Sequence, residues 1–184
     1  MAGDKILLDA CVLYPTVLRE ILIGVAAEGL YAPLWSARIL EEWARAAARR
    51  GGVAEETWAR GDIATLRATF PGAEVAPRPA LEARLFLPDP NDVHVLAAAI
   101  AGGAEAVVTF NASDFPRGTL RAEGLERRDP DGFLWELWSQ HPERVAAVVE
   151  AVRATAERLS GQAQPMRGLM KRAKLPRLGK ALAP

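Results

Sequence analysis

The sequence is poor in the residues that bind soft metals or form disulfides. Among 184 residues there is one cysteine, Cys11, and there are two histidines, His94 and His141. A single cysteine cannot form an intrachain disulfide, and zinc sites are usually built from several cysteines and histidines. A metal site in this chain would therefore have to use oxygen ligands, which favours Mg²⁺ or Mn²⁺ over zinc.

Long apolar runs are also missing. The segment VLAAAIAGGAEAVV (95–108) is interrupted and is shorter than the roughly 20 apolar residues that cross a bilayer. The chain does not begin with a basic and then apolar signal segment. Half of the residues are hydrophobic and a quarter are charged, which is typical of soluble globular proteins. We expect a cytoplasmic protein without membrane contact.

The net charge of zero hides an uneven distribution. From residue 161 to the end there are six basic residues and no acidic one, which leaves 17 basic against 23 acidic residues in the first 160 positions, a net charge of −6. This pattern predicts an acidic body with a basic tail. The tail is either a solvated end or a segment that folds back on the acidic surface.

Segments with helical and strand periodicity alternate along the chain, which is typical of an α/β protein with a parallel sheet. We predict strands at 6–8, 30–36, 73–77, 106–109 and 124–130. We predict helices at 16–28, 37–50, 54–70, 92–103, 131–141 and 142–159. Ser36 is a good N-cap for the second helix, and Gly51 with Gly52 ends it. The tail after residue 160 has no strong periodicity.

Two of the predicted strands are followed closely by polar and acidic residues. Asp9 comes directly after the apolar run 6–8, and Asn111 and Asp114 follow the strand that ends at Thr109. Ligands of α/β proteins gather at the carboxyl ends of parallel strands. Asp9 could instead begin a turn, but a carboxylate inside an apolar run is costly without a partner. We expect these residues to meet at one edge of the sheet.

Acidic residues also lie near the starts of two predicted helices. Glu41 and Glu42 are about 100° apart around a helix, so that one can border the buried face while the other faces water. Asp89 is placed to cap a helix, and Asp92 follows three residues later, where a capping partner is usual. His94 is most simply a satisfied polar residue of a buried helix. Together the carboxylates make a candidate cage for hard divalent cations.

These residues resemble those of the PIN-domain ribonucleases, and in particular the VapC-type toxins of bacterial toxin–antitoxin pairs. The resemblance rests on LLDACVLYP (7–15), SARILEEWAR (36–45) and DPNDVHVLAAAIAGGAEAVVTFNASDFP (89–116). It implies an α/β fold of three layers, with a central parallel sheet flanked by helices. We therefore expect a PIN-like nuclease domain at 1–130, a C-terminal helical extension at 131–160 and a basic tail at 161–184.

By this resemblance four acidic residues would bind the metal and catalyse: Asp9, Glu42, Asp92 and Asp114. Glu42 matches the helix glutamate of the family better than Glu41 does. Thr109 and Asn111 match polar residues that line the same pocket. The family usually has Asn, Ser or Thr at the position of Cys11, and a thiol is a poor ligand for Mg²⁺.

The implied activity is endoribonuclease cleavage that depends on Mg²⁺ or Mn²⁺. Candidate phosphate contacts are the basic tail and the side chains of Arg19, Arg38, Arg45 and Arg117. The same resemblance implies a homodimer and a cognate antitoxin protein as partner.

Two other classes of protein are alternatives. A phosphatase similar to the haloacid dehalogenases would need a second aspartate two residues after Asp9, where Cys11 stands. Nucleotide-binding folds fit less well, because neither GxGxxG nor GxxxxGK[ST] occurs. A catalytically silent PIN-like module that binds RNA or a protein is compatible with the same residues.

Overall fold

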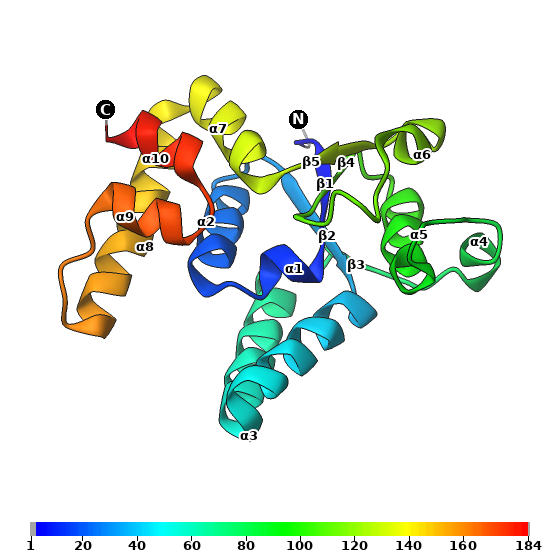
Figure 1. Cartoon of the computed structure of the whole chain (residues 1–184), viewed down its shortest axis with the longest axis horizontal. Helices are drawn as coiled ribbons and strands as arrows, with labels where there is room; N and C mark the ends of the chain where they lie inside the picture. The colour runs from blue at the N-terminus through cyan, green and yellow to red at the C-terminus, as the bar shows by residue number, and fades with distance from the viewer. Residues whose placement is uncertain (1–2, 184) are drawn as a thin grey trace.

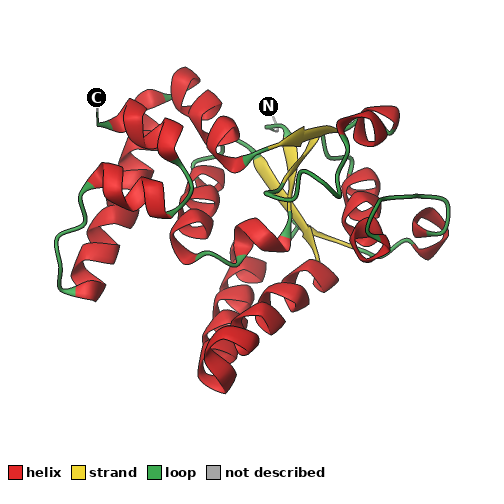
Figure 2. Cartoon of the chain, viewed as in Figure 1, coloured by secondary structure: helices red, strands yellow, loops and turns green. Residues whose placement is uncertain are grey.

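A parallel sheet of five strands forms the centre of the protein, as predicted. The structure is a computed structural model that describes residues 3–183. The strand order is β3-β2-β1-β4-β5, and helices lie around the sheet (Figure 2). The strands are β1 Lys5–Leu8, β2 Ala32–Ser36, β3 Glu74–Val75, β4 Ala106–Val108 and β5 Glu126–Arg128.

The central strand β1 and its neighbour β4 are apolar because helices cover both faces of the sheet. In β1, Leu7 is fully buried and lies opposite Leu34 of β2 on one side and Val107 of β4 on the other. β1 and β4 are therefore neighbours, and the residues that follow them leave the sheet at the same edge.

The long helices agree with the sequence prediction, while five short ones of four to seven residues were missed because one or two turns give little periodic signal. The helices are α1 Ala10–Leu13, α2 Thr16–Ala27, α3 Ala37–Thr69, α4 Pro79–Glu82, α5 Val93–Gly102, α6 Arg117–Ala122, α7 Pro130–Gln140, α8 Pro142–Ser160, α9 Met166–Arg172 and α10 Pro176–Leu182, with the 3₁₀ helix η1 Pro90–Asp92 before α5. Of the described helices, none is long and apolar enough to cross a membrane.

The helix α3 consists of two arms joined at Gly52, where two separate helices were predicted. Gly52 has φ 70° and ψ −156°, a conformation that glycine adopts at far lower cost than other residues. Figure 1 shows the two arms side by side, meeting at a tip away from the sheet. Ser36 caps the first arm as predicted, accepting a hydrogen bond from the Ile39 N–H at 3.2 Å.

The basic tail is folded, although its sequence has no strong periodicity. It forms α9 and α10, which pack against each other, and α10 also packs with α7 (Figure 1). Five of its apolar residues are buried: Leu169, Met170, Ala173, Leu175 and Leu178. The Asp131 carboxylate caps α10, accepting hydrogen bonds from the backbone N–H groups of Arg177 at 2.8 Å and Leu178 at 2.9 Å. The reading as a solvated end was therefore wrong.

Candidate metal centre

The carboxyl ends of β1 and β4 bring Asp9 and Thr109 together. Asp9 follows β1 directly, and its backbone N–H bonds to the carbonyl oxygen of Val108 at 3.2 Å. The Thr109 hydroxyl donates a hydrogen bond of 2.7 Å to Asp9 Oδ2. Both residues are buried, with 8 % of Asp9 exposed. The predicted meeting of these residues at one edge of the sheet follows from the pairing of β1 with β4.

Asn111 connects this pair to two further aspartates. Its backbone N–H donates to Thr109 Oγ1 at 2.9 Å, and its side-chain Nδ2 donates to Asp92 Oδ2 at 3.1 Å. Its Oδ1 accepts from the backbone N–H of Asp114 at 3.3 Å. Thr109 and Asn111 thus join Asp9, Asp92 and Asp114 in one hydrogen-bonded cluster.

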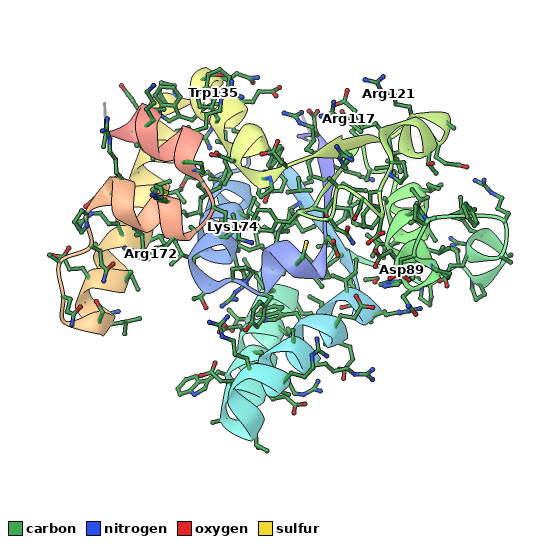
Figure 3. All side chains as sticks on the ribbon, viewed as in Figure 1. Asp89, Arg117, Arg121, Trp135, Arg172 and Lys174 are labelled. Carbon is green, nitrogen blue, oxygen red and sulfur yellow. The ribbon has the colours of Figure 1, made fainter. Side chains whose placement is uncertain are left out.

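Asp89 belongs to the same acidic cluster. Asp89, Asp92 and Asp114 each place an oxygen so that the three atoms lie within 4.8 Å of one another. Asp89 also caps η1, accepting a hydrogen bond from the Asn91 N–H at 2.9 Å, as its cap role predicted. Figure 3 shows Asp89 beside the start of α5. From the sequence we predicted only the cap role for Asp89, although its spacing from Asp92 could have indicated that it also joins the acidic cluster.

Glu42, rather than Glu41, faces this pocket. Glu42 Oε1 lies 2.8 Å from His94 Nε2 and 3.4 Å from Arg38 Nε. Glu41 pairs instead with Arg45 and Arg60 on the outer side of α3. The contact of Glu42 with His94 was not predicted, because a buried histidine has no sequence signal for its partner.

The Asp92 carboxyl titrates far above its ordinary range. Its pKa is raised from 3.8 to about 6, first by desolvation and then by the negative charges of Asp9, Asp89, Asp114 and Glu42. The neighbouring carboxylates therefore add electrostatic repulsion to the effect of desolvation on Asp92. A set of carboxylate oxygens at this spacing fits a hard divalent cation, which would relieve that repulsion.

We predict a pH dependence of stability from this raised pKa. The folded state binds the Asp92 proton more tightly than the unfolded chain, so the destabilisation is fully present above about pH 6 and is relieved as the pH falls toward 4. After allowance for partial solvent access the effect is about 1 kcal/mol, or roughly 2–4 °C in Tm. With EDTA present, Asp92→Asn should melt above the parent protein at pH 7.5, with a smaller gap at pH 5. An equal difference in Tm between variant and parent at both pH values would contradict the raised pKa of Asp92.

Cys11 fills the polar position of the pocket as a hydrogen-bond donor. Its thiol lies 3.2 Å from Asp9 Oδ2 and 3.4 Å from Thr109 Oγ1, and its sulfur accepts from the Phe110 N–H at 3.3 Å. Burial, followed by the charge of Asp9, raises the pKa of the thiol to about 12. The thiol therefore stays protonated and donates to Asp9, as a hydroxyl at this position would.

One of the four candidate RNA-contact arginines has a structural role. Arg19 is 5 % exposed, donates to the carbonyl of Leu13 at 2.9 Å and to Asp62 at 2.8 Å, and stacks on Trp43. Its charge is therefore used inside the protein, and its assignment as an RNA contact stays a prediction. Arg38 and Arg117 are exposed, and Figure 3 shows Arg117 with Arg121 on α6.

Comparison with known proteins assigns the family. A sequence model of the PIN domain matches residues 5–113, which is more than half of the chain. The chain therefore belongs to the PIN-domain family. PIN domains are generally nucleases that bind divalent metals, and the acidic cluster described above fits that activity. In comparisons with curated proteins and with solved structures, the chain has no significant match.

Proposed function

We propose that the protein is an endoribonuclease that cleaves RNA phosphodiester bonds with Mg²⁺ or Mn²⁺ as cofactor. The observation that carries the proposal is the acidic cluster in which carboxylate oxygens of Asp89, Asp92 and Asp114 lie within 4.8 Å of one another. Hydrogen bonds through Asn111 and Thr109 join this cluster to Asp9. These groups lie around the carboxyl ends of two neighbouring strands of a PIN domain. A pocket of this kind needs a cation to accept a phosphate group, because its own charge would repel the substrate.

The chain's own residues prepare the pocket for this reaction. Thr109 and Cys11 both donate to Asp9 Oδ2, and Asn111 donates to Asp92 Oδ2. Within residues 3–183 no protein donor reaches the other oxygen of either carboxylate, so each carboxylate keeps one oxygen for the cation. When bound, the metal activates a water molecule and stabilises charge on the phosphate. The proposed metal-binding and catalytic residues are Asp9, Glu42, Asp92 and Asp114.

We further propose that the protein is the toxin of a bacterial toxin–antitoxin pair of the VapC type. The motifs at 7–15, 36–45 and 89–116 support this through their resemblance to those toxins. The proposal includes a cognate antitoxin, a homodimer and a cytoplasmic location, with the nuclease domain at 1–130. Expression of the chain alone should slow bacterial growth, and Asp92→Asn should restore it. Normal growth with abundant soluble parent protein would exclude the toxin role.

The nuclease proposal is tested by RNA cleavage with and without metal. The purified protein should cut a structured RNA with Mn²⁺ or Mg²⁺, stop when EDTA is added and recover when excess metal is returned. Glu42→Gln should lower the rate at least 10-fold, since it removes a charge from the pocket. Glu41→Gln is the matched control, because Glu41 pairs with Arg45 and Arg60 on the outer side of the same helix.

Three results would change the proposal. Cleavage that persists in EDTA would exclude a metal-dependent reaction. Equal loss in Glu41→Gln and Glu42→Gln would contradict the choice of glutamate. If the parent binds RNA or a protein but cuts no RNA with either metal, the chain is a catalytically silent PIN-like binding module.

A further inference from the structure

A groove with a volume of about 950 Å³ opens beside the metal centre. Cys11 and Phe110 line it, and both belong to the hydrogen-bonded group around Asp9. One wall is formed by the two arms of α3, and the other by Arg172, the last residue of α9, and by Lys174, two residues further on. The second wall lies outside residues 5–113, which the PIN domain model matches.

Aromatic side chains line this groove and stay partly open to solvent. Trp58 is 74 % exposed, and Tyr14 and Phe110 are partly exposed. Trp43, by contrast, is buried under Arg19. An exposed indole on a groove wall offers a flat face on which an unpaired nucleobase can stack.

The groove also carries positive charge that the protein leaves unpaired. Arg50, Arg172 and Lys174 line it, and none of the three has a salt bridge within residues 3–183. Glu55 lines it without a salt bridge as well, and Asp62 is paired with Arg19, so the unpaired charge is about +2. This excess contrasts with the acidic pocket next to it.

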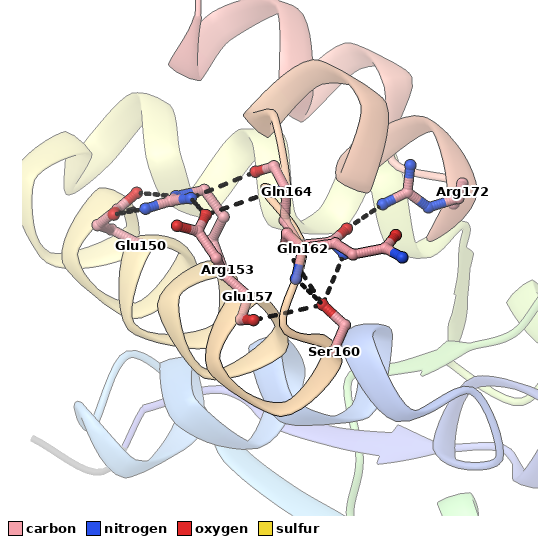
Figure 4. Close-up of polar contacts among 7 residues, drawn as sticks. All are labelled: Glu150, Arg153, Glu157, Ser160, Gln162, Gln164 and Arg172. Atoms are coloured by element: carbon pink, nitrogen blue, oxygen red, sulfur yellow. Dashed lines mark hydrogen bonds and ion pairs between the residues drawn. The ribbon is translucent and has the colours of Figure 1, made fainter.

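The cations of the second wall are held in place without being neutralised. Arg172 donates to the amide oxygen of Gln164, a neutral partner that orients the guanidinium and leaves its charge intact (Figure 4). The Lys174 ammonium lies 4.8 Å from the centre of the Phe110 ring. Figure 3 shows Arg172 and Lys174 on the same side of the molecule, apart from Arg117 and Arg121.

Lys174 occupies a backbone conformation that favours glycine. Its φ is 60°, and it follows the end of α9, where a left-handed glycine commonly ends a helix. Within residues 3–183 it is the only residue other than glycine with a positive φ. The chain thus keeps a lysine at a strained position, and the amine of that lysine faces the groove beside Phe110.

We propose that this groove binds a single-stranded segment of RNA and leads it to the metal centre. Bases would stack on Trp58, and phosphates would contact Arg50, Arg172 and Lys174. Single strands fit better than duplex RNA because stacking on a side chain needs unpaired bases. This inference rests on the proposed nuclease function and gives the C-terminal helices a part in substrate binding.

The test measures binding of a fluorescein-labelled 12-nucleotide polyuridylate by fluorescence anisotropy, in EDTA so that the RNA is not cut. Trp58→Ala should weaken binding about 10-fold through loss of stacking. Lys174→Gly and Arg172→Gln should each weaken it several-fold and lower the slope of log K against log salt by about 0.7. Duplex RNA of the same length should compete poorly.

Lys174→Gly separates binding from folding, because glycine relieves the positive φ. It should melt at or above the temperature of the parent protein while binding RNA less tightly. Lys180→Gln is the matched control, since it removes a cation from the same C-terminal segment outside the groove. Its affinity for RNA should stay within about twofold of the parent, apart from a small effect of net charge.

Two results would overturn the groove assignment. One is an affinity unchanged in Trp58→Ala, Arg172→Gln and Lys174→Gly while the parent still cuts RNA, which would leave the nuclease proposal standing. The other is the absence of RNA binding by the parent, which would favour a protein segment in the groove. Conversely, groove-dependent binding without cleavage in Mn²⁺ would support the groove and exclude the nuclease.

Discussion

Asp92→Asn is expected to reduce RNA cleavage by about 100-fold or more while leaving the fold intact. The amide has the size of the carboxylate and still accepts a hydrogen bond, but it removes one negative charge from the cluster that would bind the cation. Circular dichroism should match that of the parent. Addition of Mn²⁺ should raise the Tm of the parent protein through preferential binding to the folded state, and it should raise that of the variant much less.

Asp89→Asn is the matched variant for this experiment. Asparagine is as good an N-cap as aspartate, so the hydrogen bond from the Asn91 N–H can be kept. If the role of Asp89 is the cap, cleavage should stay within about fivefold of the parent. A loss as large as that of Asp92→Asn would make Asp89 a metal ligand. Full activity of Asp92→Asn would show that the pocket is not the active site.

Leu178→Ala is expected to be among the most destabilising changes in the C-terminal helices. Leu178 is fully buried in α10, next to the hydrogen bond between its backbone N–H and Asp131. Truncation of a buried leucine costs about 2–5 kcal/mol, which corresponds to a fall in Tm of roughly 5–15 °C for a chain of this size. Thermal denaturation followed by circular dichroism measures the change.

The control for Leu178→Ala is Lys180→Ala, two residues further along the same helix. Lys180 is exposed, so the Tm of Lys180→Ala should stay within about 2 °C of that of the parent. If the Tm of Leu178→Ala also stays within about 2 °C of the parent, α10 is not packed against the rest of the protein. It would also remove the physical basis for a fixed second wall of the groove.

The central part of the fold could be predicted because its signals are local. The run before Asp9 is apolar on both faces of the strand, and the helix after Asp92 is almost wholly apolar, as a parallel sheet with covering helices requires. The order of these segments then places the predicted acidic residues at one edge. The site prediction depends on that topology more than on any single residue.

The parts that could not be predicted depend on contacts between distant residues. Arg19 looks like any surface arginine in sequence, yet Asp62 lies 43 positions away and binds it inside the protein. The tail has two helices of seven residues each, too short for a clear period, and Leu175 becomes a core residue only when it packs in the C-terminal helices. Neither the pairing of Arg19 with Asp62 nor the packing of Leu175 can be predicted from neighbouring residues.

The reversal of α3 at Gly52 has a consequence for where an RNA would be cut. The first arm carries Glu42 at the metal centre, the second carries Trp58 at the groove, and Arg60 of the second arm pairs with Glu41 of the first. This ion pair helps to keep the spacing between the two places fixed. For the proposed nuclease, the fixed distance between the two arms would set how many nucleotides separate the base stacked on Trp58 from the phosphodiester bond that is cleaved.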